Sequence, residues 1–152
     1  MASARRDSLA GVSALELPPT PESVPEARAF VRETLRATSV DVDTAMLLVS
    51  EVTTNAVLHA RTSVTVQVQV TGDVVRVEVT DGSPAVPRIH SYGPTSATGR
   101  GLRLVDQLAR SWGVRDDPDG GKVVWFEVGA PSESAWAELD GGWLVEGATY
   151  EQ

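Results

Sequence analysis

Two adjacent runs of alternating valines constrain the fold more than any other feature of this chain. The first run places valine at every second position from Val64 to Val70, and the second does the same from Val75 to Val79. Strict alternation places the apolar side chains of a strand on one face. The short turn Thr71-Gly72-Asp73 between the runs favours a β-hairpin. The sequence therefore predicts a hairpin with one buried face.

Helical patterns elsewhere supply elements that can cover this face. Apolar residues spaced three and four apart predict one helix from residue 21 to about residue 38. A second helix runs to about residue 60 and is capped by Asp41 or Asp43. A third is expected to begin at Gly99-Arg100-Gly101.

Three further segments predict strands. The apolar stretch from Val12 to Leu17 ends at two prolines, which is typical of an edge strand. Residues 112–114 and 123–128 flank a turn rich in Asp and Gly. The order strand, helix, helix, hairpin, loop, helix, hairpin predicts an α/β (α+β) two-layer sandwich. Its sheet is mixed and mostly antiparallel, with the helices on one face.

Composition divides the chain into three parts. A length of 152 residues with 41% hydrophobic content suffices for one ordinary core, expected in residues 12–130. Residues 1–11 are small and polar, so we expect a disordered lead. Residues 131–152 hold five acids and neither Lys nor Arg, so we expect an acidic, partly disordered tail. Residues 82–98, with three prolines and no period, are expected to form a lid.

Charge and residue usage exclude several functional classes. The net charge is −8 and the basic residues are scattered singly, which argues against direct binding of nucleic acid. Because the chain has no cysteine, it has no disulfide, thiolate metal site or cysteine nucleophile. The sequence shows neither a signal peptide nor an 18-residue apolar run, so we expect a cytoplasmic protein that does not bind membranes.

Three polar residues share one face of the second predicted helix. Glu51, Asn55 and His59 are four residues apart and lie beside the apolar stripe. The carboxamide oxygen of Asn55 is a hard, neutral ligand suited to Mg²⁺. Glu51 can act as a general base or hold a metal-bound water. Taken singly, Asn55 and Glu51 are better explained as residues of a solvated helix surface, and His59 is better explained by its favourable interaction with the helix dipole.

Asp81 and the Gly99–Gly101 segment can likewise be interpreted either as ligand-binding groups or as ordinary local structure. Asp81 ends a strand, where its carboxylate can accept hydrogen bonds from an exocyclic amine or simply belong to an Asp-Gly turn. Gly99 and Gly101 open a helix, where glycines let a phosphate approach the free N–H groups or merely mark the helix start. Arg100 between them can add a charge-assisted contact. In this order the four features predict a Mg²⁺-nucleotide site.

In the same order the segments resemble the GHKL superfamily of Bergerat-fold ATPases, in which an N box, a G1 box and a G2 box frame ATP. Residues 50–60, 98–102 and 120–126 are most similar to bacterial anti-sigma-factor serine/threonine kinases of the actinomycete type, which have a histidine kinase-like ATPase domain. The resemblance spans about residues 12–129. It implies a Bergerat ATP-binding fold with an ATP lid.

The resemblance also implies a role for each site residue. Asn55 ligates Mg²⁺, Glu51 serves as the base, and Asp81 binds the adenine amine. In the G2 box, Gly99, Gly101 and Leu102 contact phosphates through the backbone. The full set of nucleotide-binding positions in this box is Thr98, Gly99, Arg100, Gly101 and Leu102.

Two functions follow from the resemblance. The leading one is an ATP-dependent serine/threonine kinase that phosphorylates a serine of an anti-anti-sigma partner, with a sigma factor as the alternative partner and a homodimer implied. The alternative is a nucleotide-gated protein-binding module without turnover. It is motivated by Ser83 and Ala85, which stand where the G1 box commonly has glycines. Val123 or Val124 likewise occupies the region where the superfamily often has a Thr.

Two other classes are disfavoured. A sensor histidine kinase needs a phosphoacceptor helix, and no segment before Pro18 has the length for one. In a Rossmann dehydrogenase the Gly-x-Gly would follow a strand, whereas here it follows the predicted lid.

Overall fold

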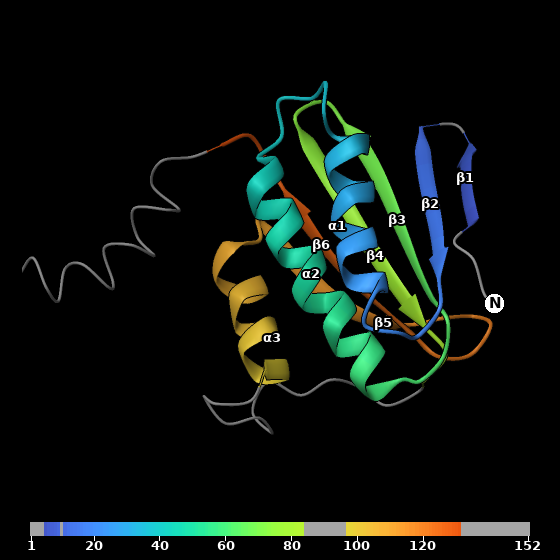
Figure 1. Cartoon of the computed structure of the whole chain (residues 1–152). Helices are drawn as coiled ribbons and strands as arrows, with labels where there is room; N and C mark the ends of the chain where they lie inside the picture. Colours follow the sequence, from blue (N-terminus) through green and yellow to red (C-terminus); the bar gives the residue numbers. More distant parts are fainter. Residues whose placement is uncertain (1–4, 10, 84–96, 132–152) are drawn as a thin grey trace, which may run out of the picture.

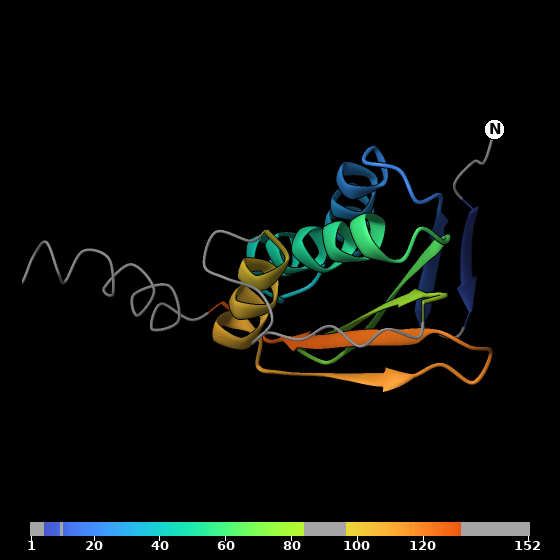
Figure 2. The same cartoon turned by 90° about the horizontal axis from the view of Figure 1, so that it is seen from below.

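The computed structural model describes residues 5–9, 11–83 and 97–131. Within these ranges, six strands form one sheet in the order β1-β2-β3-β4-β6-β5. Helices α1, α2 and α3 lie over one face of this sheet (Figure 1). Figure 2 shows the two layers: the helices lie above the orange strands β5 and β6, and the sheet rises beside the helices at the dark blue strands β1 and β2. The predicted two-layer fold is confirmed, and every strand pairing in the described residues is antiparallel.

The valine hairpin forms the centre of the sheet. Val64 pairs with Asp81 at one end, and Gly72, with φ of +63°, turns the chain at the other. A positive φ is accessible to glycine at little steric cost, which suits a tight hairpin turn. The bounds of the strands are β1 Arg5–Leu9, β2 Val12–Leu17, β3 Val64–Thr71, β4 Val74–Asp81, β5 Ser111–Asp116 and β6 Lys122–Val128.

The predicted disordered lead is wrong for residues 5–9. These residues form β1, which pairs with β2 along its whole length through a turn at Gly11 (φ +81°). The prediction relied on the scarcity of apolar side chains, but an outer strand can be held by backbone hydrogen bonds to its single neighbour. Strand β2 is therefore not the predicted edge strand, because it lies between β1 and β3. Residues 1–4 and 10 lie outside the described residues.

Three helices cover the sheet. Their bounds are α1 Ser23–Thr34, α2 Val42–His59 and α3 Ala97–Leu108. Asp41, and not Asp43, caps α2, because its Oδ1 atom accepts a hydrogen bond from the N–H of Thr44 at 3.2 Å. Helix α1 ends four residues before the predicted bound, and α3 begins two residues before Gly99. Most of the predicted lid (residues 84–96) and tail (132–152) lies outside the described residues.

The core lies between the helices and the covered face of the sheet. Each strand of the valine hairpin contributes alternate residues to it, as the sequence predicts. Helix α2 is the middle helix and contacts both α1 and α3. The fully buried residues with the largest side chains are Phe126, Leu15, Leu17, Leu35, Leu48, Val31, Val49, Val64, Val66, Val68 and Val75.

The opposite face of the sheet carries a network of charged side chains. Arg115 donates to both carboxylate oxygens of Glu78, at 2.9 and 3.2 Å, and Arg76 donates to the same carboxylate at 2.9 Å. The guanidinium of Arg76 also lies 3.9 Å from the centre of the Trp125 ring, a cation–π distance. Glu127 accepts a further hydrogen bond from Arg76. These contacts connect β4, β5 and β6 on the side away from the helices.

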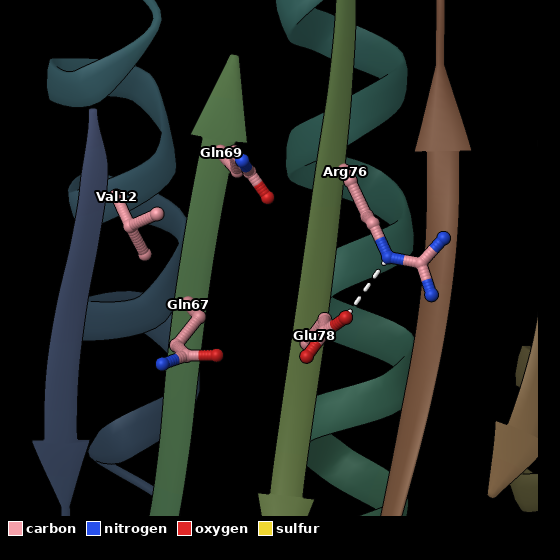
Figure 3. A pocket seen from close by; sticks show the side chains of 5 residues that line it. All are labelled: Val12, Gln67, Gln69, Arg76 and Glu78. Carbon is pink, nitrogen blue, oxygen red and sulfur yellow. Dashed lines mark hydrogen bonds and ion pairs between the residues drawn. The ribbon is translucent and has the colours of Figure 1, made fainter. Parts of the chain in front are cut away.

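A shallow cavity lies beside this network. Its volume is about 170 Å³. Figure 3 shows its lining side chains in front of strands β2, β3 and β4, with the helical layer behind them. The lining residues are Val12, Gln67, Gln69, Arg76 and Glu78. The cavity therefore belongs to the face opposite the core.

The network makes stability depend on pH. Burial raises the pKa of Glu78, but hydrogen bonds and charges from Arg115 and Arg76 outweigh it, so the pKa lies below its ordinary value. A lowered carboxyl pKa stabilises the fold above the unfolded-state pKa of about 4.3, and this contribution is lost as pH falls through the folded-state pKa. We predict that Glu78→Gln lowers the free energy of unfolding at pH 7 by about 1 kcal/mol.

Urea unfolding of Glu78→Gln and the unaltered chain at a series of pH values tests this prediction. The difference in unfolding free energy should shrink below about pH 4, where the unaltered carboxylate is protonated in the unfolded state and then in the folded state. A difference of the same size at every pH would contradict it.

Candidate functional site

Four elements meet at one end of the molecule, the lower end in Figure 1. Helix α2 ends there at His59, shortly before β3 begins at Val64. Val64 pairs with Asp81, the last residue of β4, and Asp81 pairs with Lys122, the first residue of β6. Helix α3 also begins at this end. The site end comprises the last turns of α2, the end of β4, the start of β6 and the first turn of α3.

Helix α2 is fixed at both ends and along its length. It begins at the Asp41 cap, and after Ala60 the chain leaves the helix through Arg61, whose φ is +58°. A left-handed residue directly after a helix is a common way to end it. Between these ends, Arg28 of α1 donates to the hydroxyl of Ser50 at 3.3 Å. These contacts hold the segment that carries the N box.

The side chain of Asn55 has a buried acceptor atom, and the hydroxyl of Thr53 is likewise buried without a hydrogen-bond partner among the described residues. The residue is half-buried, and its Oδ1 atom is buried with no hydrogen-bond partner in the described part of the chain. Leaving a buried acceptor without a partner costs roughly 1–3 kcal/mol. A neutral carboxamide oxygen is a ligand type that Mg²⁺ accepts, so the residue fits the predicted metal role.

Glu51 lies about one helical turn before Asn55 in α2, and His59 lies about one turn after it. Glu51 is half-buried, whereas His59 is exposed at the last helical residue. The position of His59 agrees with the dipole interaction expected for it. The assignment of Glu51 as a base stays a prediction.

Asp81 lies buried at the end of β4 and is paired with a lysine. The Nζ atom of Lys122 lies 3.0 Å from both Oδ1 and Oδ2 of this carboxylate. The N–H of Ser83 donates to Oδ1 at 2.8 Å. Asp81 and Lys122 expose only 4% and 7% of their surfaces, so the ion pair is almost removed from solvent. Charges buried in this way are normally paired, because isolation would be costly.

Lys122 is a site residue that the sequence analysis did not assign. It is the only lysine of the chain. Residues two apart in a strand lie on the same face, so Lys122 shares a face with Val124 and Phe126, which are buried in the core. Its side chain therefore lies on the covered face of the sheet. Asp81 occupies the equivalent place opposite it on β4. The sequence pattern that could have predicted this ion pair is a single charged residue on the core face of each of the two strands.

Close packing of backbone brings the two charges together. Gly121 has φ of +97°, and a Cβ atom there would overlap the carbonyl oxygen of Asp81 and the backbone of Gly82. The N–H of Gly82 donates in turn to the hydroxyl of Thr62 at 2.7 Å. The segments after α2, after β4 and before β6 therefore meet beside the ion pair.

The first turn of α3 lies at this end of the molecule. In an α-helix the first four N–H groups have no intrahelical partner, and here they belong to residues 97–100, including Thr98, Gly99 and Arg100. Such a terminus favours anions. Gly101 and Leu102 follow these donors. Contacts of all five G2-box residues with phosphates stay predictions.

Of the positions that depart from the family pattern, Ser83 is half-buried beside Asp81, and Val123 and Val124 are buried in β6. Ala85 lies outside the described residues. In the described ranges, no group of three or more His, Cys, Asp or Glu side chains is placed to hold a metal ion. No helix of the described chain is long and apolar enough to cross a membrane.

Comparison with known proteins identifies the domain type. The model of a family described as "Histidine kinase-like ATPase domain" matches residues 17–127. The search of curated proteins gives no match. The matched range begins at the end of β2 and stops near the end of β6, so it includes every element of the site end.

The close approach at Gly121 generates a prediction with a neighbouring control. Gly120 and Gly121 both have positive φ, at +92° and +97°, but only Gly121 has atoms within 4 Å of an added Cβ. We predict that Gly121→Ala lowers the free energy of unfolding by about 1–3 kcal/mol more than Gly120→Ala. Thermal or urea unfolding measures both variants. Equal losses would show that backbone strain alone, without steric overlap, accounts for the effect.

Proposed function

The chain belongs to the family of histidine kinase-like ATPase domains, and from this premise we propose that it binds MgATP at the site end as a serine/threonine protein kinase of the anti-sigma type. The observation that carries the proposal is the buried Oδ1 atom of Asn55, which has no hydrogen-bond partner among the described residues. It lies on the helix whose last turns share one end of the molecule with the buried Asp81 carboxylate and the start of α3.

Each part of a magnesium nucleotide has a chemical counterpart at this end. Asn55 would hold Mg²⁺ together with phosphate oxygens, and the ion would neutralise phosphate charge during transfer. The N–H groups at the start of α3 suit phosphate oxygens. Asp81 presents a carboxylate that can accept hydrogen bonds from a base amine.

Glu51 is our candidate for the general base. It precedes Asn55 by one helical turn, so it lies on the same side of α2 as the metal ligand. In the proposed reaction, the hydroxyl oxygen of a protein serine bonds to the γ-phosphorus of ATP. The bond from this phosphorus to the bridging oxygen breaks, ADP leaves, and Glu51 accepts the hydroxyl proton.

The resemblance suggests a serine of an anti-anti-sigma protein as the phosphate acceptor, with a sigma factor as the alternative partner. Phosphoryl transfer requires mainly positioning and charge neutralisation. The few polar groups at the site end are therefore compatible with this chemistry. The two predictions below separate nucleotide binding from phosphate transfer.

The first prediction concerns nucleotide binding. Asn55→Ala should raise the dissociation constant for MgATP at least about tenfold, because the metal loses its protein ligand. Since Oδ1 makes no hydrogen bond in the described residues, the substitution removes none from the fold, and the unfolding free energy should not fall by more than about 1 kcal/mol. Isothermal titration calorimetry and urea unfolding give the two quantities.

Thr54→Ala is the matched control for Asn55→Ala. The Thr54 hydroxyl donates within the helix to the carbonyl oxygen of Ser50 at 2.7 Å, so its loss should leave MgATP affinity unchanged. An Asn55→Ala variant that binds MgATP as tightly as this control would remove Asn55 from the metal site.

The second prediction concerns transfer. Glu51→Gln should retain MgATP affinity but lower the rate of partner phosphorylation at least about a hundredfold, because the amide cannot accept the hydroxyl proton. The assay incubates the chain with γ-labelled ATP and candidate anti-anti-sigma proteins. Unchanged transfer would exclude Glu51 as the base. Nucleotide-dependent complex formation without any label, already in the unaltered chain, would support the binding module instead.

A further inference from the structure

The Asp81–Lys122 ion pair gives the proposed base pocket both a donor and an acceptor. Oδ1 of Asp81 already accepts from Lys122 and from the N–H of Ser83. Oδ2 accepts from Lys122 alone among the described residues, so it can take one more hydrogen bond. The Lys122 ammonium carries three N–H groups, of which the two carboxylate oxygens engage at most two. An acceptor and a donor therefore lie side by side.

An unpaired carboxylate would select its base differently. It offers acceptors only, so it would favour the 6-amino group of adenine and repel the 6-carbonyl oxygen of hypoxanthine or guanine. Beside Lys122 this repulsion is offset, because Nζ can donate to the 6-carbonyl oxygen, whereas the 6-amino group of adenine donates to Oδ2.

We infer that Lys122 determines the base specificity of the site, and that through it the chain binds 6-oxopurine nucleotides nearly as well as adenine nucleotides. The inference rests on the proposed function, because it requires the base to lie against Asp81. It goes further by naming the ligand class and the residue that selects it.

The surroundings hold Lys122 in this arrangement. Its partner carboxylate is 4% exposed, and Gly121, the residue before Lys122, packs directly against the backbone of Asp81 and Gly82. A long side chain confined in this way loses little further entropy when it donates to a base. The buried pair also connects β4 to β6, so the test must separate base selection from this structural contact.

The test compares MgATP with MgITP, whose bases differ only at C6 and N1. Calorimetric titration of the full chain should give dissociation constants that differ by less than about tenfold. In Lys122→Met the carboxylate loses its donor neighbour, so the ratio of the ITP constant to the ATP constant should rise at least about tenfold. If Lys122 made only a structural contact, its loss would weaken the binding of both nucleotides equally and leave the ratio of the two dissociation constants unchanged.

Two further variants control the measurement. Arg115→Met breaks the ion pair with Glu78 on the opposite face of the sheet, so it should leave the ratio unchanged. Lys122→Arg retains a cation and donors, so the ratio should stay low even if Lys122→Met does not fold.

Three results would overturn the inference. One is a preference of the unaltered chain for ATP above about a hundredfold, and another is an unchanged ratio in folded Lys122→Met. Either would leave the proposed function standing. Failure of the unaltered chain to bind either nucleotide at millimolar concentration would overturn both proposals.

Discussion

The fold depends on the burial of one apolar face of an antiparallel sheet. The alternating valines of β3 and β4, from Val64 to Val70 and from Val75 to Val79, lie on this face, and removing them from water requires a helical layer. The connections then decide where the helices end. Helix α2 leads into β3, and the first residue of β3 pairs with the last residue of β4. The last turn of α2 and the end of β4 therefore lie at one end of the molecule. The position of the site is a consequence of covering the sheet.

The charged side chains on the two faces of the sheet differ in their exposure to solvent. On the open face, Arg76 and Arg115 share the carboxylate of Glu78, and water screens these contacts. The covered face carries Asp81 and Lys122 at the end of its apolar rows, and both are buried. Removing two charges from water is costly, so a buried pair is poor evidence of added stability. Its position at the site end is the reason that we propose a role for it in ligand recognition.

Local patterns predicted the central hairpin and the three helices because their signals lie within one element. Alternating valines specify a one-sided strand, and a capping Asp before the second helix is visible from its own sequence, although only the structure selects Asp41 over Asp43. The first strand was missed because Arg5–Leu9 is held by pairing with β2, and its own side chains show no apolar alternation. The Asp81–Lys122 pair was missed for a similar reason. It joins residues 41 positions apart, and only the register of β4 against β6 brings them together.

The single lysine gives the protein an unusual chemical property. Apart from the α-amino group of the chain, Lys122 is its only primary amine, and it is buried against a carboxylate. Reagents that acylate amines should therefore modify this side chain only when the site end opens. The rate of that reaction would measure local opening at one defined position, without any introduced label.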